Sequence, residues 1–158
     1  MMRTIIALLA LCACLLAPAY SQDSEHYIYK ERASTKAVTG IADRFSRTLK
    51  QSGMTGVVED IRRCYFSEGE TLMALSPKGK HLVRLCMIYD RLAYSVDLSM
   101  RSMEQAQFQN SEPVSEYLTD DAFNQRFGAY VGDAFPEQEL AVPYLSDATR
   151  RALKAFKF

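Results

Sequence analysis

The longest amphipathic pattern in the chain runs from Pro77 to about Gln107 and predicts a long helix. Ser76 and Pro77 mark its start, because an N-cap serine followed by proline at the first helical position is typical of a helix N-terminus. At about 100° per residue its apolar side chains fall on two stripes, and only a narrow side is polar. A helix that is apolar on two sides is covered on two sides. We therefore expect the other helices to pack around this central one.

Shorter amphipathic segments lie on both sides of the central helix. Helical spacing of their apolar residues predicts helices over residues 34–51, 55–66, 120–134 and 147–156. Gly53 is a natural left-handed cap between the first two. Thr119 and Ser146 are candidate N-caps of the last two, and Leu153 is expected to face inward. No convincing strand pattern appears. The predicted fold class is all-α, with about five helices packed around a long central helix in a single domain over residues 34–158.

The beginning of the chain has the three-part pattern of a secretory signal peptide. Arg3 is followed by an apolar run over residues 5–16, and a small-x-small cleavage site ends at Ser21. The run is too short for a membrane span, which needs about 20 apolar residues. We therefore expect residues 1–21 to be a signal peptide and the protein to be periplasmic or secreted.

Two further expectations follow from this leader. Residues 22–33 are mostly polar and are predicted to form a flexible N-terminal arm. A lipid anchor at Cys14 remains an alternative to simple cleavage after about Ser21. No other segment is long and apolar enough to span a membrane, so no integral membrane segment is expected after signal cleavage.

Cys64 and Cys86 are the two cysteines outside the leader. An even number of cysteines in an exported chain favours a disulfide, because the compartment is oxidising. A bond between them would join the second helix to the central one and stabilise the fold by roughly 3 kcal/mol. Two free buried thiols are the alternative interpretation.

The overall composition excludes several classes of function. Lys and Arg together number 19, as do Asp and Glu, so the chain has no net field that would attract nucleic acid. Its two histidines, His26 and His81, lie far apart in the sequence, and a zinc site needs several ligands at close spacing. No nucleophile motif such as G-x-S-x-G is present. We therefore expect no metal, no cofactor and no nucleic-acid partner.

Five polar residues of the central helix form a predicted structural lattice. Asp90 and Asp97 fall between the two apolar stripes, so they should be partly buried and need partners. Arg101 follows Asp97 by four positions, and Tyr89 and Tyr94 offer hydroxyls, with Asp90 and Tyr94 also four apart. The alternative is a hydrolase acid/base pair of Asp90 and Asp97. Their separation of about 10 Å is too long for a shared-proton dyad and marginal for a glycosidase, so no catalytic residue is predicted.

The C-terminal helix is rich in cations. Arg150, Arg151, Lys154 and Lys157 stand against a single acid, Asp147. One interpretation is a basic face for an anionic surface or partner. The interpretation that we favour is a solvated face whose cations complement the C-terminal end of the helix dipole.

The stretch from Cys86 to Asp97 reads C-[ML]-x-Y-D-x-x-A-Y-x-x-D. With the leader and the cysteine pair, it resembles small exported helical proteins of proteobacteria whose function is unknown, and this resemblance implies no activity. A fainter similarity is to exported lysozyme-inhibitor-type domains, although this chain has only two cysteines after the leader. Small periplasmic acid-stress chaperones share the two cysteines and the helices but are shorter.

The expected function is that of an exported, non-enzymatic protein that binds another protein or serves the upkeep of the cell envelope. An inhibitor or acid-stress chaperone acting on a protein is the first alternative. A hydrolase using Asp90 and Asp97 is the second.

Overall fold

The computed structural model describes residues 32–66, 77–105 and 115–156. Within them the chain forms four α-helices and two short 3-10 helices, and no β-strand, which confirms the all-α class. The elements are α3 (Thr35–Phe66), α5 (Pro77–Gln105), η1 (Glu116–Leu118), α6 (Asp120–Ala134), η2 (Gln138–Leu140) and α7 (Ala141–Ala155). The predicted signal peptide and nearly all of the predicted arm lie outside the described residues.

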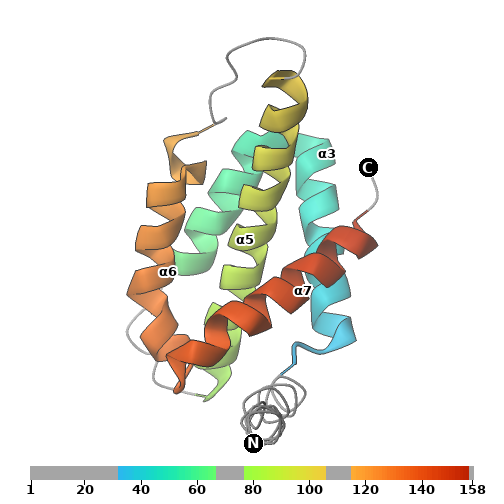
Figure 1. Cartoon of the computed structure of the whole chain (residues 1–158). Coiled ribbons are helices and arrows are strands. Elements are labelled where there is room, and N and C mark those ends of the chain that lie inside the picture. The colour runs from blue at the N-terminus through green and yellow to red at the C-terminus, as the bar shows by residue number, and fades with distance from the viewer. Residues whose placement is uncertain (1–31, 67–76, 106–114, 157–158) are drawn as a thin grey trace, which may run out of the picture. The chain divides into compact units, whose positions relative to one another are not determined.

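The predicted count of five helices is wrong, because the segments 34–51 and 55–66 are two arms of α3. Gly53 lies between them with φ 63° and ψ −166°, a non-helical conformation that glycine adopts without steric cost. The arms fold back on each other, since Thr48 Oγ1 donates to Asp60 Oδ2 at 2.8 Å. Twelve residues of straight helix would span about 18 Å instead. Figure 1 shows the two arms, blue to cyan and then green, meeting at the bend.

Helix α5 is in contact with α3, α6 and α7, and Figure 1 shows it between α3 and α6 with α7 crossing it. Ile88, Leu92 and Ala93 are completely buried on it, and Val96 is nearly so. Both apolar stripes are covered along most of their length, as the pattern predicts, but Leu98 and Met103 near the end of the helix are 43% and 59% exposed. The helix is described as far as Gln105, and its predicted end at about Gln107 lies outside the described residues.

Helix α6 begins and ends where the sequence predicts. The Thr119 side chain caps it by accepting from the backbone N–H of Ala122 at 3.2 Å. The helix runs antiparallel to α5: Arg84 Nε, early in α5, donates to the carbonyl of Ala134 at 2.8 Å, whereas Tyr94, further along α5, bonds to Asp120. These two contacts fix the register of the pair at both ends of α6.

Helix α7 differs from its prediction, because it begins at Ala141 and not after Ser146. Pro143 does not prevent this, since it lies in the first turn, where its missing N–H has no helical partner. The earlier start buries Tyr144 and Leu145 against the core. Leu153, expected to face inward, is 40% exposed.

A disulfide joins Cys64, near the end of α3, to Cys86 in α5, as predicted, with their Cα atoms 5.7 Å apart. It closes the connection between these two helices, and cross-links of this loop length stabilise a fold by roughly 3 kcal/mol. The start of the described chain is also fastened: Ala33 is buried, and Arg151 Nη1 donates to its carbonyl at 2.8 Å. Arg151 therefore stabilises the fold by holding the start of α3 against α7.

Candidate functional site

Two carboxylates, Asp60 on α3 and Asp90 on α5, each have a set of polar partners. We call them the Asp60 junction, between α3 and α5, and the Asp90 junction, between α5, α6 and α3. Tyr89 belongs to the first and Asp90 to the second, although the two residues are adjacent in the sequence. Successive helix positions differ by about 100°, so neighbours on one helix reach different partner helices.

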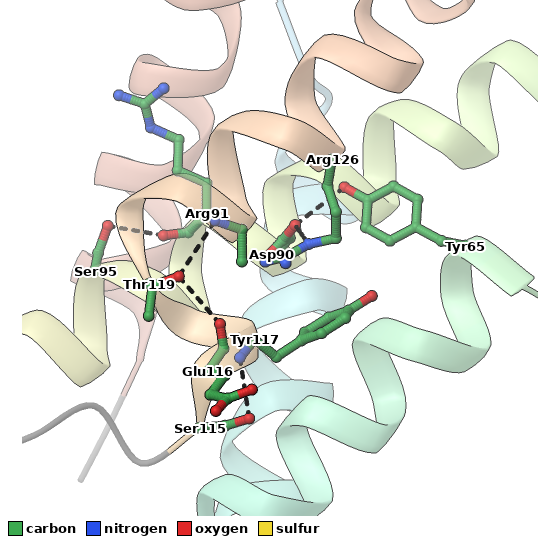
Figure 2. A network of polar contacts seen from close by, with 10 residues as sticks. Tyr65, Asp90, Arg91, Ser95, Ser115, Glu116, Tyr117, Thr119 and Arg126 are labelled. Carbon is green, nitrogen blue, oxygen red and sulfur yellow. Dashed lines mark hydrogen bonds and ion pairs between the residues drawn. The ribbon is translucent and has the colours of Figure 1, made fainter.

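The Asp90 junction is buried. Asp90 is only 1% exposed, and Arg126 of α6 donates to both of its carboxylate oxygens at 2.8 Å, through Nε and Nη2. The Tyr65 hydroxyl of α3 adds a third hydrogen bond at 3.3 Å (Figure 2). The guanidinium also lies 3.9 Å from the centroid of the Tyr117 ring. A bidentate pair of this kind provides charge-assisted hydrogen bonds that offset the burial of both charges.

Burial shapes the titration of this junction. It raises the pKa of the Asp90 carboxyl above 3.8, and the hydrogen bonds and charge of Arg126 limit that rise. Burial likewise raises the pKa of Tyr65 well above its ordinary value, with the charge of Asp90 adding to the effect. Arg126 and Tyr65 both donate hydrogen bonds to the Asp90 carboxylate. The pKa of Asp90 is therefore raised although both of its oxygens accept hydrogen bonds within the fold.

The Asp60 junction lies nearer to solvent. Asp60 has a side chain that is 17% exposed, and Arg44 contacts both carboxylate oxygens at 3.1 and 3.2 Å. Thr48 donates at 2.8 Å and the Tyr89 hydroxyl at 3.1 Å. Burial by itself raises the pKa of Asp60, but its hydrogen bonds to Arg44, Thr48 and Tyr89 outweigh that effect and lower it below 3.8. The junction therefore favours the ionised carboxylate.

The remaining predicted residues are divided between α5 and α6. Asp97 is fully buried, and Arg101 Nε donates to it at 2.8 Å, as the i,i+4 spacing predicts. Tyr94 hydrogen bonds to Asp120 of α6, so the expected pairing of Tyr94 with Asp90 is wrong. The physical reason is that Asp90 already accepts from Arg126 and from α3.

Sequence reasoning missed Asp60, Arg126 and Tyr65 as partners of the α5 residues. A signal for two of them exists. Arg126 falls at helical spacing within the apolar stripe that contains Phe123 and Tyr130, and Asp60 lies within that of the second arm of α3. A charged residue inside an apolar stripe needs a buried partner of opposite sign or several hydrogen bonds.

Among the surface hollows formed by described residues are three that neither Asp90 nor Asp97 lines. The largest, about 530 Å³, lies beside η1 and the start of α6. The second, about 450 Å³, is the α3–α5 groove, lined by Ser34, Lys36, Ala37, Gly40, Ile41, Arg44, Cys64, His81, Leu85 and Tyr89. The third, about 420 Å³, is the basic hollow between α5 and α7, lined by Arg91, Ser95, Ser146, Thr149, Arg150, Leu153 and Lys154.

Two further properties concern the part of the chain that the structure describes. It contains no group of three or more His, Cys, Asp or Glu side chains arranged to hold a metal ion. None of its helices combines the length and the apolar character that crossing a membrane requires.

Comparisons with protein-family models, with curated proteins and with solved structures find no match to this chain. A functional proposal for it rests on the geometry of its own residues.

Proposed function

We propose that this chain is an exported, disulfide-bonded helical protein that binds a protein partner in the cell envelope and does not use its buried carboxylates for catalysis. The observation that carries the proposal is the placement of Asp90 and Asp97, which are 1% and 0% exposed and each held by an arginine. A general acid or base must come within hydrogen-bond reach of a substrate. Carboxylates that are buried and paired are suited to fixing helices.

Export is supported by the apolar leader and by the Cys64–Cys86 bond, since disulfides persist in oxidising compartments. We propose cleavage after about Ser21 and a periplasmic or secreted location. Cell fractionation followed by intact-mass measurement tests this. A chain that begins at Gln22 with both remaining cysteines oxidised is the expected result, and a cytoplasmic protein with two free thiols would contradict it.

The α3–α5 groove is the surface that we propose for the partner. Its lining includes the apolar side chains of Ile41 and Leu85 and two cations, the exposed Lys36 and Arg44, which is also bonded to Asp60. An apolar centre with a polar rim is the usual anatomy of a protein interface. The groove therefore suits a partner segment that presents an apolar side chain flanked by carboxylates.

Gly40 is a position at which a larger side chain can block the groove, which allows the proposed surface to be tested. It lies within a helical arm, where glycine is less favourable than alanine by about 1 kcal/mol, and a Cβ built on it meets no atom within 4 Å. Gly128 of α6 has the same open surroundings and is likewise exposed, so it provides a matched control.

We expect Gly40→Leu to fill the groove and Gly128→Leu to leave it unchanged, with both variants as stable as the parent or more so. Each protein is immobilised and used to capture partners from an envelope extract. Loss of a captured protein with Gly40→Leu but not with Gly128→Leu is the expected outcome. Equal capture by all three proteins would contradict the proposed surface.

A separate test concerns catalysis. If the protein turns over a substrate, and Asp97→Asn abolishes that turnover while the variant stays folded, the proposed absence of catalysis is contradicted.

A further inference from the structure

The basic hollow lies where α7 crosses α5, away from the groove proposed for the protein partner. Three of the seven residues that line it are cationic, Arg91 from α5 with Arg150 and Lys154 from α7, and none is acidic. Serine and threonine hydroxyls and the exposed side chain of Leu153 complete the lining. The hollow is therefore a concave surface of one charge sign built from two packed helices.

Arg91 is the first of two residues in this hollow whose side chain forms no hydrogen bond with the described residues. It is half-buried, and within the described residues its guanidinium forms no hydrogen bond and no ion pair; its backbone carbonyl accepts from the Ser95 hydroxyl at 2.8 Å. Figure 2 shows its side chain extending away from the Asp90–Arg126 pair. Burial lowers the pKa of Arg91, and the interaction with the nearby Tyr94 offsets this only in part.

Thr149 is the second residue of the hollow whose side chain forms no hydrogen bond with the described residues. Its side chain is 4% exposed, and among the described residues its buried Oγ1 has no hydrogen-bond partner. Buried hydroxyls in folded proteins are nearly always hydrogen-bonded, so an unsatisfied one in a surface hollow calls for a ligand or water. An unpaired cation and an unpaired hydroxyl thus line the same hollow.

We propose that the basic hollow binds a phosphate group, with Arg91 as its principal donor. The planar guanidinium fork matches two phosphate oxygens, whereas Lys154 supplies a point charge and Thr149 a hydroxyl donor. Arg150 remains bonded to Asp147 at 2.9 Å and adds charge at the edge of the hollow. A volume of about 420 Å³ is in the range of small-ligand sites, so it admits a phosphate together with an organic group that packs on Leu153.

Phosphate titration tests this in the purified protein, at constant ionic strength and with acetate as the comparison anion. The wild type should show a saturable rise in melting temperature with phosphate that acetate does not reproduce. Arg91→Gln should weaken phosphate binding at least about tenfold, the loss expected for one charge-assisted hydrogen bond. Lys50→Gln, which removes an exposed cation of α3, should bind phosphate as the wild type does.

Neither test variant should fail to fold. Arg91→Gln removes a cation that has no partner, and Thr149→Val removes a hydroxyl that has none, so both proteins should melt no lower than the wild type when phosphate is absent. Thr149→Val should nevertheless show a smaller rise in melting temperature with phosphate. A merely structural role for these residues would lower the melting temperature without phosphate.

Vesicles distinguish the two sources of a phosphate group. Binding to an equimolar mixture of phosphatidylglycerol and phosphatidylcholine, absent with phosphatidylcholine alone and weakened by Arg91→Gln, would identify a lipid headgroup as the ligand. Phosphate binding without vesicle binding would identify a soluble phosphate compound. The proposal is overturned if phosphate acts no differently from acetate, or if Arg91→Gln binds phosphate like the wild type.

Discussion

The Asp60 and Asp90 junctions each hold a carboxylate within the fold, one near solvent and the other fully buried. In each of them an arginine and a tyrosine hydroxyl hold one carboxylate, and adjacent residues of α5, Tyr89 and Asp90, take part in them. Asp60 retains 17% exposure of its side chain and has a lowered pKa, whereas Asp90 retains 1% and has a raised one. At Asp60 the lowering effect of Arg44, Thr48 and Tyr89 exceeds the modest burial, whereas at Asp90 the deep burial exceeds the lowering effect of Arg126 and Tyr65.

The comparison shows where the fold depends on a single partner. Around Asp60, Thr48 and Tyr89 remain as donors if Arg44 is removed, and water reaches the site. Around Asp90, removal of Arg126 leaves only the longer bond from Tyr65. A buried carboxylate without its cation is far more costly than an exposed one, so the two junctions should respond differently to the same kind of substitution.

The largest effect is expected for Arg126→Met. It leaves Asp90 buried and unpaired, which should reduce the free energy of unfolding by about 3–5 kcal/mol in urea denaturation. Arg62→Met is a matched control, because Arg62 also lies over the Tyr117 ring but is exposed and should matter by less than about 1 kcal/mol. Similar small losses for both variants would show that the Asp90 junction is not a buried ion pair.

The disulfide reinforces only one of the two interfaces, because Cys64 and Cys86 join α3 to α5 and leave α6 untouched. Replacing both cysteines with alanine should cost about 3 kcal/mol in the free energy of unfolding. Amide hydrogen exchange should then accelerate first near the end of α3. A loss below about 1 kcal/mol would contradict this role.

Asp60→Asn should cost about 1–2 kcal/mol at neutral pH, because an amide replaces a carboxylate held by a cation and two hydroxyls. The pKa of Asp60 is lowered by folding, so its contribution is present above 3.8 and is lost as the pH falls through the folded-state value. The stabilities of the wild type and the variant should therefore converge below about pH 4. A difference that stays constant in unfolding measurements from neutral to acid pH would contradict the shift.

The smallest effect is expected for Tyr94→Phe. Its hydroxyl bonds to Asp120 at the surface, and its ring stacks on Phe123 with centroids 5.2 Å apart, a contact that phenylalanine keeps. The free energy of unfolding, measured by urea denaturation, should change by less than about 1 kcal/mol. A loss of unfolding free energy as large as that of Arg126→Met would contradict the prediction that the surface contact matters less than the buried one.

Local sequence rules account for the helices whose ends carry their own signals. Thr119 caps α6 as expected, and Asp97 pairs with Arg101 because i,i+4 neighbours meet on any helix. Gly53 does break the helical conformation, but the chain resumes helix at once, so two predicted helices form one bent element. The start of α7 was misplaced because Ser146 looks like a cap, whereas burial of its first turn in the core draws the helix start back.

The partners across the junctions could not be predicted in the same way. Arg126 lies 36 positions from Asp90, and Asp60 lies 29 from Tyr89, so no local spacing rule connects them. Their meeting depends on how the helices pack, which follows from the whole set of apolar faces. The sequence does show that Asp90 is buried and needs a partner, but not which residue supplies it.

Paired double-mutant cycles, measured by urea unfolding, test most directly the claim that the buried polar residues of α5 organise the fold. One cycle combines Asp90→Asn with Arg126→Met, and the other combines Asp60→Asn with Arg44→Met. We predict a coupling energy of at least about 2 kcal/mol for the buried pair and less than about 1 kcal/mol for the pair nearer to solvent. Equal couplings, or a larger one at Asp60, would contradict the account.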